Sequence, residues 1–181
     1  MNNVNILVGS APMGKAKTWA YPDGNPSDVY RIPTYKVTVS SGSGTGSKTR
    51  DFEAIRFGIQ KKGAAKARVV GLADSQTHTI KLWLPDYTVH SAPSNEDGAW
   101  QVYDNFLVHD GPDKPFSQIY ASIGCVEICN GPEGFVEFND YIISLAEPSA
   151  RTRDLQLLEI GNSGQLSITY ERATRPPLVR W

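Results

Sequence analysis

A histidine and a cysteine suited to acyl transfer lie in the stretch from His109 to Cys125. His109 ends an apolar run, and Cys125 stands at the end of Ser122-Ile123-Gly124-Cys125. A thiol is a useful nucleophile near neutral pH only when a base or a positive field favours the thiolate. Because the cysteine follows a glycine in a tight segment, exposed backbone N–H groups there can hold a developing oxyanion. The pattern predicts a cysteine acyl-transfer site.

Two further histidines and two aspartates accompany this pair. His109 is the preferred base because Asp110 and the following turn give the strand a sharp exit, which places the imidazole at a sheet rim. His90 has a similar position and is predicted to bind substrate or to orient a partner, while His78 is predicted at the surface. Asp110 and Asp113 can orient His109, although aspartate is common in such turns anyway. A backbone carbonyl can do the same by accepting from the ring N–H.

Each cysteine also has a possible non-catalytic role. A lone cysteine such as Cys125 is commonly a small buried apolar residue. Cys129 is read first as a core thiol, with a disulfide to Cys125 or a metal-ligand role as alternatives. Zinc is the main rival chemistry, because the chain has five potential ligands but no pair with zinc-finger spacing. These ligands are His78, His90, His109, Cys125 and Cys129.

The bulk composition is that of an ordinary globular protein. A chain of 181 residues fits one domain with a substantial core. Its net charge of −1 provides no global field for nucleic acid or an anionic membrane, so any partner must be recognised locally. Two cysteines are too few for a disulfide scaffold. With 16 Gly and 12 Pro, turns are plentiful, which favours a β-rich architecture.

The start of the chain does not resemble a signal peptide. The apolar patch at residues 6–8 is short and no basic residue precedes it, and no later run is long enough to cross a bilayer. We therefore expect a protein that stays in the cytoplasm of the producing cell or leaves it by a signal-independent route.

The predicted organisation is an irregular N-terminal arm over residues 1–32 and one mainly β domain over residues 33–181, shaped as a sandwich or barrel-like sheet. One helix is expected at about Pro132–Leu145, ended by Pro148, with its N-terminus just beyond Cys125. The Gly/Ser segment after residue 39 is read as a hairpin loop, and the tail from Arg172 as an extended strap. The predicted strands are Tyr35–Val39, Asp51–Phe57, Ala67–Leu72, Thr79–Leu84, Tyr87–His90, Ala99–Tyr103, Asn105–His109, Leu155–Ile160 and Leu166–Tyr170.

At its chemical centre the chain resembles the L,D-transpeptidase (YkuD-like) catalytic domain family. That family carries His-x-Gly or His-Gly, then a loop, then Ser-x-Gly-Cys, and its helix follows the cysteine. The close match covers about residues 105–130. The matching residues are His109, Gly111, Ser122, Gly124 and Cys125.

The resemblance implies that Cys125 attacks the amide between a diamino acid and a terminal D-alanine of a peptidoglycan stem peptide. His109 would take the thiol proton and later protonate the leaving amine. The backbone amides of Gly124 and Cys125 would supply the oxyanion hole, and Ser122 would shape the pocket. The acyl-enzyme would then pass to an amine or to water, giving transpeptidation, D-amino-acid exchange or carboxypeptidase activity without a cofactor or a metal.

One departure from the family concerns the residue two positions after the cysteine, which is usually arginine and here is Glu127. A glutamate cannot donate two hydrogen bonds to a substrate carboxylate, and it reverses the local charge. Arg56 or Lys114 can compensate. The residues expected to bind substrate are His90, Asp110, Gly111, Glu127 and Arg56.

A wall-directed motif without a recognisable export signal leads to the hypothesis of a secreted antibacterial effector, for example cargo of a type VI system. Its partners would then be the stem peptide, secretion machinery and an immunity protein, with no nucleic acid and no membrane insertion. Two other classes stay open: a non-enzymatic β-rich binding domain with a buried Cys125 and a structural His109, and a zinc-dependent hydrolase.

Overall fold

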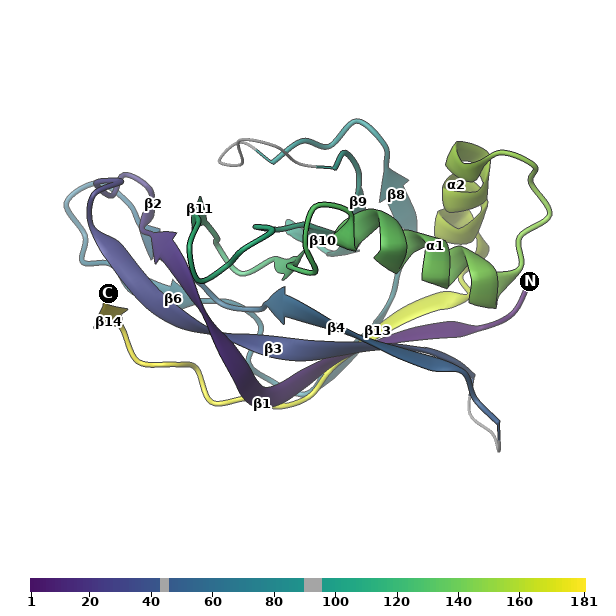
Figure 1. Ribbon diagram of the computed structural model, residues 1–181, viewed down its shortest axis with the longest axis horizontal. Helices are drawn as coiled ribbons and strands as arrows, with labels where there is room; N and C mark the ends of the chain where they lie inside the picture. Colours follow the sequence, from purple (N-terminus) through teal and green to yellow (C-terminus); the bar gives the residue numbers. More distant parts are fainter. Residues whose placement is uncertain (43–45, 90–95) are drawn as a thin grey trace.

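The computed structural model describes residues 1–42, 46–89 and 96–181 (Figure 1). Its strands form an 11-stranded mixed sheet and a 3-stranded sheet. The elements of the large sheet are β1 (Val4–Trp19), β3 (Val29–Ser41), β4 (Thr49–Ile55), β7 (Gln76–Thr79), β8 (Leu82–Leu84), β9 (Ala99–Tyr103), β10 (Phe106–Asp110), β11 (Ile119–Ala121), β12 (Val126–Ile128), β13 (Leu166–Tyr170) and β14 (Val179–Arg180). The small sheet contains β2 (Tyr21–Pro22), β5 (Gly58–Lys61) and β6 (Arg68–Val70), and the helices are α1 (Gly134–Ala146) and α2 (Arg153–Ser163).

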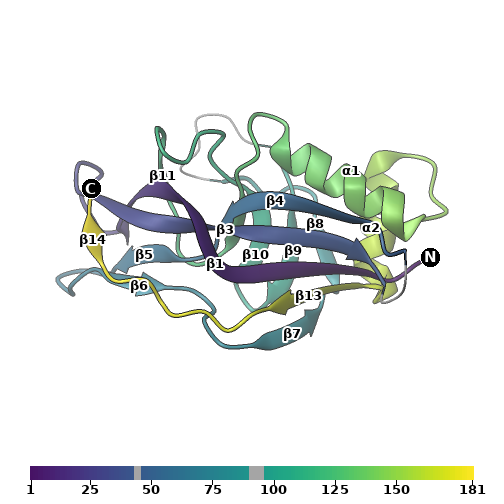
Figure 2. The same cartoon turned by 60° about the horizontal axis from the view of Figure 1, so that its bottom comes forward.

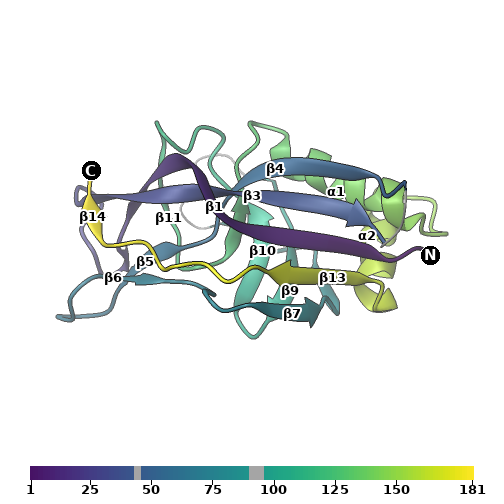
Figure 3. The same ribbon diagram turned by 90° about the horizontal axis from the view of Figure 1, so that it is seen from below.

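The main path of the large sheet runs β7-β13-β1-β3-β4-β12-β10-β9-β8, with β11 added to β1 and β14 to β3. Both helices and strands β8 to β10 lie on the same side of the layer formed by β1, β3 and β4 (Figures 1 and 3). The described part of the sheet does not close into a barrel. The prediction of a mainly β fold is therefore confirmed. The prediction of a single short helix is wrong, because the described residues form two helices.

The N-terminal segment differs most from the prediction. Residues 1–32 were expected to be irregular, yet β1 is the longest strand and pairs with β3, β11 and β13. At the start of β1, buried and partly buried residues alternate from Val4 to Val8, as a strand with one face on the core requires. The register shifts around Pro12, which has no N–H for the ladder, and β1 bends sharply near its middle (Figure 2).

Several local predictions are confirmed. The Gly/Ser segment connects β3 to β4 as a hairpin with Ser40 opposite Thr49, and the predicted strands that became β3, β4, β6, β9, β10 and β13 are present. The tail is extended and ends in β14 beside β3. Three strand predictions are wrong: 79–84 is divided between β7 and β8, residues 87–89 form no strand, and 155–160 is helical.

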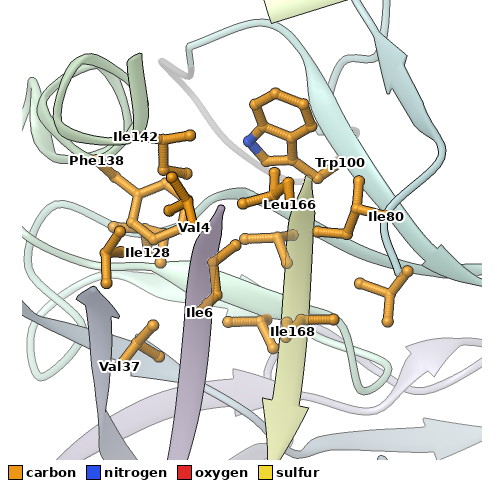
Figure 4. Packing of buried hydrophobic residues seen from close by; sticks show 14 of the residues in the cluster. Val4, Ile6, Val37, Ile80, Trp100, Ile128, Phe138, Ile142, Leu166 and Ile168 are labelled. Carbon is orange, nitrogen blue, oxygen red and sulfur yellow. The ribbon is translucent and has the colours of Figure 1, made fainter. Parts of the chain in front are cut away.

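Helix α1 begins at Gly134 and ends at Ala146, close to the predicted bounds. Its apolar side closes the main core over the sheet (Figure 4), where Phe138 and Ile142 pack near Val4 and Ile128. Burying side chains of this size contributes about 1.5–3 kcal/mol each relative to exposure. This packing anchors α1 on the sheet next to β12, to which a short loop connects it.

Helix α2 covers residues predicted to be a strand, 155–160. The short apolar run did not separate strand from helix by itself. Leu157, Ile160 and Gly161 are buried, and this i, i+3, i+4 spacing is the helical signal. None of the helices in the described ranges is long and apolar enough to span a bilayer.

Candidate active site

Two neighbouring strands bring the predicted catalytic residues to one cavity. β10 and β12 pair in parallel with His109 opposite Glu127. Because side chains alternate along a strand, His109 shares its face with Leu107, and Glu127 shares its face with Cys125. All four line a cavity of about 310 Å³. The remaining lining residues are Tyr21, Leu84, Tyr87, Val89, Gln101, Asp104, Asn105, Ala121 and Ile123.

His109 is held in one tautomer by the backbone. Its Nδ1 lies 2.6 Å from the carbonyl oxygen of Asp110. A carbonyl only accepts, so Nδ1 carries the ring hydrogen and Nε2 of the neutral ring carries the lone pair. The imidazole is 3% exposed and packs against Tyr87, with ring centroids 5.2 Å apart. The residue predicted as base is therefore oriented as a base requires, by a backbone carbonyl.

Cys125 is a thiol in its resting state. It is 7% exposed, and its Sγ lies 3.8 Å from the carbonyl oxygen of Asn105. Burial, with a smaller contribution from the charge of Glu127, raises the pKa of the Cys125 thiol to about 12, against the opposing effect of a hydrogen bond from the Leu107 backbone. The raised pKa means that the site does not store a thiolate at rest.

Glu127 makes the floor of the cavity acidic. It is 2% exposed, and its Oε1 lies 4.0 Å from Nε2 of His109. Burial raises the pKa of the Glu127 carboxyl to about 8; the Ser122 hydroxyl lowers it and the Asp110 charge raises it. Although the Ser122 hydroxyl is near enough to affect this pKa, neither its Oγ nor Glu127 Oε2 completes a hydrogen bond of ordinary geometry within the described residues. Glu127 thus changes charge close to neutral pH.

The small residues of the motif have packing reasons of their own. Gly124 has φ +104°, and a Cβ there would lie 2.7 Å from Cα of Gly71. A Cβ at Gly111 would lie 2.9 Å from Cβ of Glu127. Ser122 is buried, and its carbonyl accepts a hydrogen bond from the Ile59 N–H. Gly111 and Gly124 are therefore required by backbone geometry whether or not they contact substrate.

Arg56 does not reach the cavity. It is fully buried and donates to the backbone carbonyls of Gly9, Leu72 and Glu171. The exposed Lys114 does not line the cavity either. The expectation that either cation replaces the family arginine finds no support in this geometry, because Arg56 is fully engaged elsewhere.

Asp110, also predicted to bind substrate, lies behind the site. Its carboxylate is buried, accepts a hydrogen bond from the Glu96 N–H at 3.0 Å and does not line the cavity. Burial raises the pKa of Asp110 to about 7. Its contribution to the site comes from its backbone carbonyl, which orients His109. His90, the fifth residue predicted to bind substrate, lies outside the described residues.

The remaining residues considered as metal ligands lie apart from one another. Cys129 is buried in a separate apolar cluster, and its Sγ donates to the carbonyl of Glu127 at 3.2 Å. Cys125 and Cys129 are both free thiols. His78 lies on β7, where its ring stacks on Tyr103. Over residues 1–42, 46–89 and 96–181, no three His, Cys, Asp or Glu side chains are placed to share one ion.

Several residues of the cavity wall were not predicted from the sequence. Tyr87 comes from a loop and Tyr21 from the short β2. Asp104 and Asn105 form the turn between β9 and β10, with φ +49° at Asp104. The Asp-Asn pair at this junction was the one usable signal, because such pairs favour tight hairpin turns.

Comparisons with protein-family models, with curated proteins and with solved structures find no match for this chain.

Proposed function

We propose that this protein is a cysteine acyl-transfer enzyme that acts on stem peptides of peptidoglycan, as an L,D-transpeptidase, an L,D-carboxypeptidase or a D-amino-acid exchange enzyme. The observation that carries the proposal is the cavity lined by both Cys125 and His109, with the His109 tautomer set by a backbone carbonyl. The motif resemblance over residues 105–130 supplies the substrate class.

In the proposed reaction, His109 Nε2 takes the Cys125 proton as Sγ attacks the amide carbonyl. The tetrahedral oxyanion is held by the backbone N–H groups of Gly124 and Cys125. When the C–N bond breaks, the imidazolium gives its proton to the leaving amine, and a thioester remains on Cys125. An amine or water then attacks the thioester, with His109 accepting its proton and returning it to the departing thiolate. Because burial raises the thiol pKa, attack and deprotonation occur together.

Digestion of purified peptidoglycan followed by mass spectrometry of the muropeptides tests this reaction. We expect the wild-type protein to remove a terminal alanine, to exchange it, or to form dimers, and Cys125→Ala to leave the profile unchanged. Cys129→Ala is the matched control, since this second thiol does not line the cavity. A profile changed equally by wild type and Cys125→Ala would contradict the nucleophile assignment. An unaltered profile with wild-type protein would contradict the reaction.

Delivery is tested separately, because peptidoglycan lies outside the cytoplasm. The chain can be expressed in a bacterial host with and without an added periplasmic signal. We expect growth inhibition or altered muropeptides only with the signal, and only when Cys125 is intact. Equal harmlessness in both compartments would contradict an antibacterial role.

A pocket that binds ligand without covalent chemistry is the second candidate. The observation that favours it is the high pKa and burial of the Cys125 thiol. Alkylation with iodoacetamide across pH separates the two: an enzyme site shows rapid reaction that falls in His109→Gln, whereas an inert thiol reacts slowly and equally in both proteins.

A further inference from the structure

We propose that the cavity at Cys125 selects an acyl donor that carries a cationic amine, and no free carboxylate, next to the scissile amide. The identity of the ligand as an acyl donor rests on the proposed function. The charge preference is a property of the cavity and can be tested without turnover. It is the reverse of what an arginine at position 127 would recognise.

The charges of the cavity all have one sign. Glu127 lies at its floor and the exposed Asp104 at its rim, and among the described residues no Lys or Arg lines it. The two segments outside the described ranges, 43–45 and 90–95, contain no Lys or Arg. Low-dielectric walls strengthen such a field, so a carboxylate would be repelled and an ammonium attracted.

Glu127 also has an unused acceptor. Its Oε2 is buried and lacks a hydrogen-bond partner within the described residues, while the residue itself lines the cavity. The Ser122 hydroxyl, which is also without a partner there, is near enough to lower the pKa of Glu127. A buried polar atom without a partner is costly, and a charged donor supplied by a ligand would remove that cost. An ammonium has three donors and no acceptor, which matches this oxygen better than a hydroxyl or a carboxylate does.

Two aromatic rings add to the preference for a cation. Tyr87 and Tyr21 line the same cavity, and Tyr87 packs on His109. Tyrosine rings attract cations through their negative faces. Burial raises the pKa of the Tyr87 hydroxyl to about 12, so this ring stays neutral and can also donate a hydrogen bond.

The size of the cavity limits the ligand to a short segment. A volume of about 310 Å³ lies at the lower end of small-molecule pockets. It suits one diamino-acid residue with its amide, and not a longer peptide. The donor predicted here is therefore a lysine-type stem, or one whose diamino-acid carboxylate is amidated, rather than one with a free carboxylate at that position.

The test measures binding to Cys125→Ala protein by NMR titration at pH 8.5, where Glu127 is charged. Three probes share an Nα-acetylated amino-acid amide and differ in the group that ends the side chain, which is an ammonium, a neutral amide or a carboxylate: Nα-acetyl-lysine amide, Nα,Nε-diacetyl-lysine amide, and the amide of Nα-acetyl-2-aminoadipic acid with its side-chain carboxylate free. We expect the cationic probe to bind about tenfold more tightly than the neutral one, and the anionic probe to bind most weakly. Equal affinities, a preference for the anion, or no binding of the cationic probe would overturn the inference.

Two matched variants locate the preference. Glu127→Gln keeps the shape and is expected to bring the cationic and neutral probes within about twofold of each other. Asp104→Asn, which retains a residue suited to positive φ, is expected to reduce the preference by only about two- to threefold, because the rim is solvated. A preference that survives Glu127→Gln would overturn the role of Glu127.

The two proposals fail in different ways. If the cationic probe binds preferentially but wild-type protein leaves every muropeptide unchanged, the proposed reaction is wrong and the charge selection stands. If wild-type protein transfers acyl groups from free-carboxylate and amidated stems at equal rates, and the probes show no preference, the reaction stands and the charge selection is wrong.

Discussion

Two buried charged residues, Arg56 and Glu127, show opposite ways of holding a charge inside this protein. Arg56 donates to three backbone carbonyls and packs among the rings of Tyr35, Phe57 and Tyr170. Glu127 has one oxygen 4.0 Å from His109 and the other without a partner among the described residues. All three side-chain nitrogens of the arginine donate hydrogen bonds, whereas one carboxylate oxygen of the glutamate is buried without a partner among the described residues.

This difference separates a buried charge whose hydrogen bonds stabilise the fold from one whose burial is only partly compensated. A satisfied buried charge fixes the segments around it, while an unsatisfied one lowers stability. The two regions also touch. The Leu72 carbonyl accepts hydrogen bonds from Arg56. Gly71, which precedes Leu72 in the chain, packs against Gly124 beside Cys125. The structural site therefore supports the wall of the candidate active site.

The largest effect is expected for Arg56→Met. It removes the donor of the part-buried hydrogen bonds to the carbonyls of Gly9, Leu72 and Glu171, so we expect a loss of about 3–5 kcal/mol in the free energy of unfolding. Denaturant unfolding measures it. Arg50→Met is the control, because this arginine is partly exposed and makes a surface ion pair with Glu137, which is worth about 1 kcal/mol or less. Similar losses in the two variants would show that the buried network is not what stabilises this region.

Gly124→Ala should have the next largest effect. The added Cβ would clash with the Gly71 backbone, and the residue would keep a strained positive φ, so we expect a loss of about 2–4 kcal/mol. Because Gly71 adjoins the Arg56 network, the rate of Cys125 alkylation should change as well. Gly131→Ala also has a positive φ but meets open space, so it controls for strain alone. Equal losses at both positions would refute the close-packing argument.

Glu127→Gln is expected to give the smallest change, with a sign opposite to the other two. The folded-state pKa of Glu127, about 8, lies above that of an unfolded glutamate. The folded protein therefore binds more protons between about pH 4.5 and 8, and its stability falls as pH rises through this window. The variant should equal wild type near pH 4 and exceed it by about 1–3 kcal/mol at pH 8.5.

Unfolding curves in urea at several pH values measure this difference. Asp110, whose pKa is also raised by burial, to about 7, remains in the variant and should leave a residual decline with pH. The groups that face or influence Glu127 are His109, Asp110, Ser122, Cys125, Cys129, Tyr87 and Tyr120. A constant difference between variant and wild type at all pH values would show that Glu127 does not titrate in this range.

Local patterns predicted the elements whose residues carry their own signal. The alternation of Tyr35–Val39 and the apolar run before His109 correspond to β3 and β10, and the spacing from Phe135 to Leu145 corresponds to α1. The N-terminal strand was missed because Gly9, Pro12 and Gly14 weaken local β propensity. Pairing with β3, β11 and β13 provides what local propensity lacks.

The candidate site divides in the same way. The motif marked Cys125 and His109, and the parallel pairing of β10 with β12 places them at one cavity. Arg56 looked like a free cation because a sequence does not show which carbonyls will surround a side chain. Tyr21 and Tyr87 were not predicted, since they reach the cavity from segments distant in the chain.

By itself, the sequence determined that the chain is mainly β and that a helix begins soon after Cys125, and it singled out one histidine and one thiol as candidates for chemistry. These follow from short-range periodicity and residue chemistry. Only the tertiary structure decided that Arg56 is a structural residue, that the Asp110 carbonyl orients His109, and that the cavity is acidic. Each of these depends on which distant backbone and side-chain groups share a desolvated space, and long-range strand pairing sets that.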